Sequence, residues 1–224
     1  MRILDVFKPK KVENSGYGNH GANTIRKSLI GWMSYSGSPK EDIDDNLETL
    51  RERSRDLYMG GAPIATGAIK TIRTNVVGGG LKLKARLDTD VLKLTDDEAE
   101  EKERQIEREF ALWSESKLCD AEKKNNFYEL QQLATLSQLL SGDAFVLLPA
   151  IRKHKFPYQI SVQLIESDRV RTPNSKSNDK NIVSGIEFGK YGEPVAYYFY
   201  RKHPGAMSSM LGEEYDRIPA YGRK

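Results

Sequence analysis

The sequence predicts an α+β fold in which two to four helices pack on one face of a mostly antiparallel sheet, after an extended basic N-terminal arm. Two observations support this prediction. Apolar residues at helical spacing, with start and stop signals, recur through residues 38–141. Shorter β-like segments separated by turn residues then follow, at 144–149, 158–166, 182–188 and 194–200. The length of 224 residues suffices for one large or two small domains.

Composition indicates a polar chain. Charged residues make up 30% of the positions and hydrophobic residues 38%, and the mean hydropathy is −0.62. No apolar run is long enough to span a bilayer, and the opening MRILDVFKPKK lacks the apolar core of a signal peptide. The one cysteine, Cys119, excludes an intrachain disulfide and a cysteine-built zinc site. We therefore expect a reducing, intracellular setting without a membrane.

Charge is distributed unevenly along the chain. The net charge is +3, but residues 88–110 hold ten acidic and four basic side chains, so the remainder carries +9. A basic surplus of this size permits contact with an anionic polymer without demonstrating it.

Residues 1–37 predict a flexible basic arm, in which lysine and arginine alternate with glycine and with Tyr17, Trp32 and Tyr35. Such an arm either docks on a neighbouring subunit or packs on its own domain, and the sequence leaves both interpretations open.

The first predicted helix begins at the capping box formed by Ser38 and Glu41 and ends at Gly60-Gly61. Its apolar stripe is the expected buried face and consists of Ile43, Leu47, Leu50 and Leu57. A second helix, 63–76, carries a stripe of Ile64, Ala68, Ile72 and Val76, and its small residues would let another helix approach closely. A half-buried strand is expected over 81–87, with Lys82, Lys84 and Arg86 on its outer face. Gly78-Gly79-Gly80 follows a helix and precedes a strand, the reverse of the order in phosphate loops.

Two further helices carry clear N-terminal signals. Thr95 and Glu98 form a capping box for an acidic helix, whose carboxylates we interpret as a solvated face. Asn126 and Glu129 bracket the start of the most apolar helix, which ends at Ser141-Gly142. Downstream, 182–188 and 194–200 predict a hairpin, and 205–224 predicts a loop.

The carboxylates and histidines of the sequence give little support for a catalytic function. Asp143, Glu166 and Asp168 stand at element ends, where catalytic carboxylates often lie, but turns and helix ends explain them equally well. His154 and His203 lack a second histidine or cysteine at metal spacing. We expect no cofactor and no enzyme activity.

Several stretches, taken together and in order, resemble the lambda-type bacteriophage portal proteins. The stretches are LETLRERSRDL at 47–57, TIRTNVVGGGLKLKAR at 71–86, FYELQQLATLSQLLSGDAFVLLP at 127–149, VQLIESDRV at 162–170, GIEFGKYGEPVAYYFYRKHPG at 185–205 and RIPAYGRK at 217–224. MGGAP at 59–63 departs from the Arg-Asn-Asn-Pro-like turn expected there, which alters only a helix connection.

The resemblance implies a non-catalytic subunit of a ring, of twelve copies, at one vertex of a tailed-phage head. Double-stranded DNA passes through such a ring during packaging and ejection, and the ring later joins head to tail. Implied partners are other copies of the chain, the terminase, a capsid or scaffold protein, a head-completion protein and DNA, in the host cytoplasm and then the virion. Residues 38–204 would form the α+β wing domain, and 205–224 would lead into the family's stem, clip and crown.

Two sets of charged residues are candidates for contacts. Dense alternation of sign on the first helix predicts subunit-interface residues Arg51, Arg55 and Asp56. The basic face Lys82, Lys84 and Arg86, with the arm, supports the alternative of a nucleic-acid-binding module. A hydrolase using Asp143, Glu166 or Asp168 is a third, weaker alternative.

Overall fold

The computed structural model describes residues 27–29, 31, 37, 43, 46–61, 63–206 and 213–221. The chain divides into two units, Met1–Asp42 and Ile43–Lys224. In the first unit the structure shows the 3₁₀ turn η3 (Lys27–Leu29), with Lys27 and Ser28 exposed. Most of the predicted arm, and the predicted capping box of Ser38 and Glu41, lie outside the described residues.

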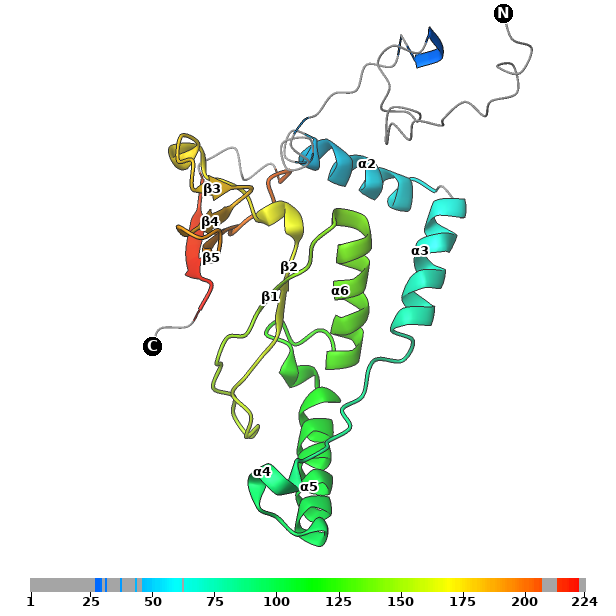
Figure 1. Ribbon diagram of the computed structural model, residues 1–224, viewed down its shortest axis with the longest axis vertical. Helices are drawn as coiled ribbons and strands as arrows, with labels where there is room; N and C mark the ends of the chain where they lie inside the picture. Colours follow the sequence, from blue (N-terminus) through cyan, green and yellow to red (C-terminus); the bar gives the residue numbers. More distant parts are fainter. Residues whose placement is uncertain are drawn as a thin grey trace, which may run out of the picture. The chain divides into compact units, whose positions relative to one another are not determined.

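The second unit is a mixed α+β structure, which confirms the predicted fold class (Figure 1). Its helical elements are α2 (Leu47–Met59), α3 (Pro63–Val76), α4 (Thr89–Leu92), α5 (Asp96–Ser114), η4 (Lys117–Cys119), α6 (Phe127–Ser141), η5 (Ser167–Arg169) and η6 (Asn174–Lys176). α2 and α3 both contact α6, which also contacts the small sheet at β2. None of the helices in the described part of the chain has the length and apolarity that a membrane crossing requires.

Two antiparallel sheets complete the unit. β1 (Phe145–Leu147) pairs with β2 (Gln163–Ile165). The larger sheet has the order β3-β4-β5-β6, built from β3 (Ile182–Val183), β4 (Ile186–Phe188), β5 (Pro194–Tyr200) and β6 (Tyr215–Pro219). The predicted hairpin is confirmed, because β4 and β5 pair with Ile186 opposite Tyr197.

Three strand expectations need correction. The predicted strand 182–188 breaks into β3 and β4 at Ser184 and Gly185, which both have positive φ. A Cβ on Gly185 would lie 2.6 Å from the backbone nitrogen of Arg171, so the close approach of two backbone segments requires glycine here. The loop expected over 205–224 contains β6, which adds to the edge of β5. The strand expected over 81–87 is absent from this fully described segment, which is extended but unpaired with any strand.

Capping explains where α5 and α6 begin. Thr95 and Glu98 form the predicted box at α5, with reciprocal hydrogen bonds between side chains and backbone N–H groups. Asn126 and Glu129 do the same at α6, whose C-cap residue Gly142 has the left-handed conformation. Each of these predictions is confirmed.

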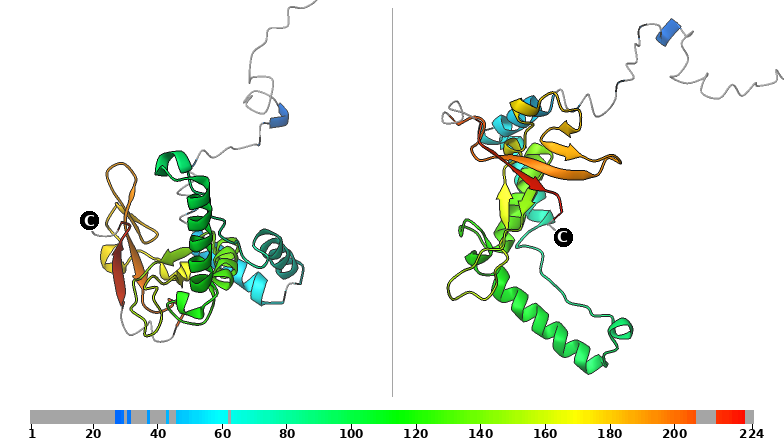
Figure 2. Two further views of the ribbon diagram at one scale, coloured as in Figure 1. Left: turned by 90° about the horizontal axis from the view of Figure 1, so that it is seen from below. Right: turned by 90° about the vertical axis from the view of Figure 1, so that its left-hand side faces the viewer.

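Two apolar clusters hold the unit together. The first joins α5, η4 and α6 to the β2 region through Trp113, Cys119, Leu130 and Val162. Phe110 and Phe127 pack against it, with ring centroids 5.7 Å apart in an edge-to-face arrangement. The second cluster, Ile165, Val170 and Phe199, links the two sheets. α4 lies beside the N-terminal end of α5, away from both clusters (Figures 1 and 2).

Candidate functional site

Helix α2 meets the rest of the unit through an arginine rather than through its apolar stripe. Arg51 is 6% exposed and is the buried residue of α2. Its guanidinium donates to the carbonyl of Ser141 at 3.0 Å and to Oδ2 of Asp143 at 2.5 Å. Ser141 is the last residue of α6, where the helix dipole places partial negative charge. Arg51 thus ties α2 to the C-terminal end of α6.

One turn further along α2, Arg55 forms an ion pair with Asp168 of η5. His203 approaches the same carboxylate, with Nε2 3.4 Å from Oδ2 of Asp168. Because Nδ1 of His203 accepts a hydrogen bond from the backbone N–H of Gly205, the ring proton lies on Nε2, facing Asp168. These groups border a hollow of about 510 Å³ between α2, α6 and η5.

The predicted interface residues therefore differ in what they contact. Arg51 and Arg55 have partners within one copy of the chain, whereas Asp56 is exposed and is in no ion pair with any residue that the structure describes. The predicted burial of the α2 stripe is wrong, because Ile43, Leu50 and Leu57 are each more than half exposed. The inner face lies beside the predicted stripe and overlaps it, because Leu47 and Ser54 are half-buried together with Arg51 and Tyr58.

The segment 81–87 satisfies its backbone with side chains instead of a neighbouring strand. The N–H groups of Ala85 and Leu87 donate to Glu107 and Glu103 of α5, at 3.0 and 2.7 Å. The N–H of Leu81 donates to Oε1 of Gln131 on α6 at 2.7 Å, and the amide of Gln131 donates back to the Leu81 carbonyl. Of the predicted inner positions only Ala85 is buried.

The three basic residues of this segment are not equivalent. Lys84 pairs with Glu107 at 3.1 Å, and this hydrogen bond together with the Ala85 N–H lowers the pKa of the Glu107 carboxyl. Lys82 and Arg86 are exposed and have no ion-pair partner among the described residues. These two are the cations that an external anion could reach.

Two of the three carboxylates considered for a hydrolase act as counter-ions. Asp143 pairs with Arg51 and Asp168 with Arg55, while Glu166 is exposed. Within the described ranges no group of three or more histidine, cysteine, aspartate or glutamate side chains is placed to hold a metal ion.

One polar cluster escaped the sequence analysis. Glu187 of β4 receives two hydrogen bonds from Arg217 of β6, at 2.8 and 2.9 Å, and one from the hydroxyl of buried Tyr198 on β5. The guanidinium, and then the hydroxyl, lower the pKa of Glu187 to about 2. No local signal predicts this contact, because the three residues meet only once β6 pairs with β5.

Comparison with known proteins places this geometry in context. The model of the family described as "Phage portal protein, lambda family" matches residues 25–222. A protein named "Probable portal protein" from Halomonas phage phiHAP-1 is 29% identical over 191 residues. That alignment covers 84% of the present chain and 36% of the relative, so the chain spans little more than a third of the relative's length.

Proposed function

Because the chain belongs to the lambda family of phage portal proteins, whose members are structural and non-catalytic, we propose that it acts as a subunit of a portal ring. The ring, of twelve copies, occupies one vertex of a tailed-phage head. Double-stranded DNA enters and leaves the head through it. The match of the family model over residues 25–222 is the observation that carries this proposal.

The partners follow from the same proposal. They are other copies of the chain, the terminase during packaging, a capsid or scaffold protein during head assembly, and a head-completion protein afterwards. The protein would lie in the host cytoplasm during assembly and then in the virion. Residues 38–204 would serve as the wing domain of the subunit, with the stem, clip and crown formed elsewhere in a longer polypeptide.

Electron microscopy of the full-length protein tests the ring directly. We expect closed rings with an axial hole, and mass photometry should give a mass close to twelve times that of the subunit. A protein that stays monomeric at high concentration would overturn the proposal. Divalent-metal-dependent DNA cleavage lost in Asp143→Asn would favour the hydrolase alternative instead.

Within the ring, Asp56 is the best placed of the three predicted interface residues, because its exposed carboxylate is free of the ion pairs that hold Arg51 and Arg55. Asp56→Lys should lower ring yield without changing the stability of the subunit. Charge reversal of Arg51 or Arg55 tests their intersubunit role less cleanly, since it also breaks contacts to Asp143 and Asp168.

Exposed Lys82 and Arg86 support a second candidate function, in which this segment binds nucleic acid. Phosphate contacts release counterions, so DNA affinity should fall steeply with salt, with a slope near −0.9 per contact. Lys82→Ala and Arg86→Ala should each reduce that slope by about one contact. Lys84→Ala is the matched control, because Lys84 already pairs with Glu107; an equal effect there would argue against the assignment.

A further inference from the structure

The chain between β1 and β2 continues the pairing of these strands as a hairpin. Ala150 lies opposite Ile160, and Lys153 lies opposite Phe156, so a turn of two residues closes the hairpin. Its tip projects beyond β1 and β2, next to the C-terminal end of α5 (Figures 1 and 2). We call residues 150–160 the basic hairpin.

Burial alternates strictly along the first strand of the hairpin and the residues that lead into it. From Phe145 to Lys153 the residues are alternately half-buried and exposed, which places Lys153 on the inner face and Arg152 on the outer face. Nζ of Lys153 donates to the carbonyls of residues 158–160 at 3.3–3.4 Å. Lys153 thus ties the two strands of the hairpin together, whereas Arg152 points to solvent.

The hairpin carries positive charge only. Residues 144–165 include Arg152, Lys153 and Lys155 but no aspartate or glutamate. Arg152 and Lys155 are exposed, as is Lys123 in the loop between η4 and α6, and none of these three has an ion-pair partner in the part of the chain that the structure describes. Burial lowers the pKa of Lys153, and the neighbouring ammonium of Lys123 lowers it further, so Lys123 lies on the inner side of the hairpin. We call Lys123, Arg152 and Lys155 the hairpin cations.

Three carboxylates around the hairpin already have partners. Glu122 pairs with Lys124 at 2.7 Å. Asp120 is buried and accepts hydrogen bonds from three backbone N–H groups of its own loop, at 2.9–3.0 Å. Glu109 of α5 accepts a hydrogen bond from the hydroxyl of Tyr158. These contacts leave the hairpin cations available to an anion from outside the unit.

Two of the hairpin cations stand where the backbone favours glycine. Lys155, in the turn of the hairpin, has a φ of 63°, and Lys123 has a φ of 57°. Both values lie in the left-handed region, which a lysine adopts only at a cost in free energy. The geometry of these turns gives no reason for a lysine, so the reason lies in what its ammonium contacts.

We propose that the basic hairpin binds the phosphate backbone of double-stranded DNA. A two-stranded β-ribbon fits in a groove of the duplex, which is bordered by two rows of phosphates. The hairpin has Arg152 on one side, Lys123 on the other and Lys155 at its tip, so its cations can reach both rows. A protein partner would favour apolar side chains at the centre of the contact, and residues 152–157 expose no large hydrophobic side chain. The choice of DNA as the polyanion rests on the proposed portal function, and the site is separate from residues 81–87.

DNA binding by the full-length protein tests the site, with fluorescence anisotropy of a short labelled duplex as the measurement. Three phosphate contacts should make the affinity fall about fortyfold between about 50 and 200 mM salt, because each contact adds about −0.9 to the slope. The triple variant Lys123→Gly, Arg152→Ala, Lys155→Gly should lose this share of the salt dependence, and each single variant should lose about one contact.

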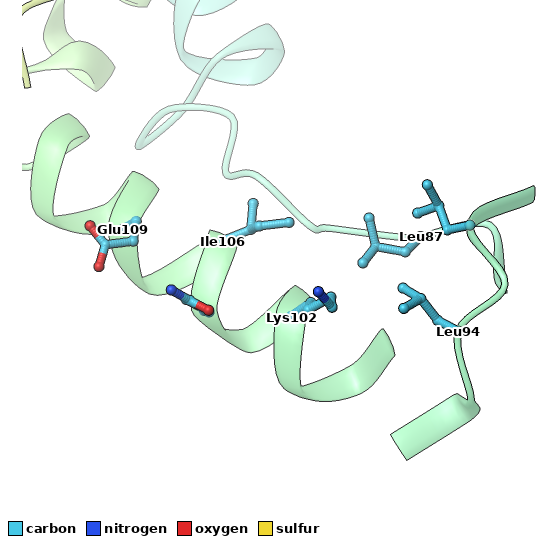
Figure 3. A pocket seen from close by; sticks show the side chains of 7 residues that line it. Leu87, Leu94, Lys102, Ile106 and Glu109 are labelled. Carbon is cyan, nitrogen blue, oxygen red and sulfur yellow. The ribbon is translucent and has the colours of Figure 1, made fainter. Parts of the chain in front are cut away.

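Lys102 supplies the matched control. This exposed lysine lies on the wall of an open groove of α5 that Glu109 also lines (Figure 3). Lys102→Ala removes one positive charge, as each single variant of the hairpin does, and should leave the salt dependence unchanged. An equal effect of Lys102→Ala would show that DNA responds only to the net charge of the protein, and would overturn the inference.

The melting temperature separates binding from folding. Lys123→Gly and Lys155→Gly place glycine in a left-handed conformation that suits it, so the melting temperature should stay the same or rise while DNA affinity falls. A loss of affinity that appears only in variants with a lower melting temperature would mean that these side chains support the fold, and would overturn the inference.

The remaining outcomes distinguish the hairpin contact from the ring. Rings in the electron microscope, with the same DNA affinity for wild type and triple variant, would overturn the hairpin contact and leave the portal function intact. DNA binding through the hairpin by a protein that forms no rings would support the contact and overturn the portal function. If the triple variant lost affinity for a poly-glutamate peptide but kept its affinity for DNA, the hairpin would bind an acidic protein surface, and the inference would be wrong.

Discussion

Helices α5 and α6 pack together through large apolar side chains, whereas α2 and α3 expose theirs. Trp113, Leu130 and Phe127 form one aromatic and aliphatic cluster, and the indole N–H of Trp113 donates to the carbonyl of Ile160 at 3.1 Å. On α2 the buried residue is Arg51. Both regions have apolar residues at helical spacing, so the period alone does not reveal which face a domain covers. A stripe left open in a single copy becomes available for contacts between copies.

The largest effect should come from the covered region. Trp113→Ala removes a buried indole and its hydrogen bond, and we expect the free energy of unfolding to fall by about 3–5 kcal/mol. Urea unfolding followed by circular dichroism measures the loss. Leu112→Ala is the control. Leu112 is the neighbour of Trp113 on α5, and its side chain is more than half exposed, so this substitution should cost little stability. Equal losses for the two variants would mean that the cluster around Trp113 is not the core.

The polar anchor of α2 should come next. Arg51→Ala leaves the carbonyl of Ser141 and the carboxylate of Asp143 without their guanidinium partner, and we expect a loss of about 2–3 kcal/mol. The estimate lies below that for a fully buried pair because the Asp143 side chain is half exposed. Arg53→Ala, two residues away on the exposed side of α2, should change stability by less than about 0.5 kcal/mol. Similar values for both arginines would contradict an anchoring role for Arg51.

A third variant, Glu187→Gln, tests the polar cluster that Glu187 forms with Tyr198 and Arg217 in the larger sheet. The folded pKa of Glu187, about 2, lies below its ordinary value of 4.5, so its ionised form stabilises the fold above pH 4.5. That contribution should disappear as the pH falls from 4.5 towards 2. Glu187→Gln should therefore cost about 1 kcal/mol at pH 7, a modest value because Arg217 is partly exposed.

The difference in unfolding free energy between wild type and Glu187→Gln should narrow steadily below pH 4.5. Glu193→Gln, the same substitution at an exposed residue of the adjoining turn, is the control for the loss of one negative charge. A constant difference between wild type and Glu187→Gln from pH 7 to pH 3 would show that the carboxylate does not titrate as its contacts require.

Local signals made parts of this fold predictable. The boxes Thr95–Glu98 and Asn126–Glu129 act within three residues, and the β4–β5 hairpin depends on the short turn between its strands. Contacts between distant residues were not predictable. Residues 81–87 alternate like a strand, but their N–H groups are satisfied by Glu103, Glu107 and Gln131, whose positions depend on how α5 and α6 pack.

The same distinction applies to the candidate site. The sequence identified Arg51, Arg55 and Asp56 as charges on one helix, but not that the first two face inward. Their partners lie roughly a hundred positions away in the chain, near Ser141 and Asp168, and no residue within α2 predicts these contacts. β6 was not predictable for a related reason. Its partner strand β5 ends at Tyr200, and β6 begins only at Tyr215, so no short turn in the sequence signals their pairing.

The smallest effect is expected where the apolar stripe is open. Ile64→Ala removes a large side chain that is 88% exposed, so the free energy of unfolding of the monomeric chain should change by less than about 0.5 kcal/mol. Leu130→Ala, a truncation of the same kind at a buried position of α6, should cost about 2–5 kcal/mol. Measuring both by urea unfolding of the monomer, and then measuring ring yield, separates folding from assembly. If Ile64→Ala lowered the stability of the monomer as Leu130→Ala does, the apolar stripe of α3 would be covered within one chain and the contrast between the two regions would fail. If it left the monomer unchanged and reduced only ring yield, the exposed stripe would serve contacts between copies.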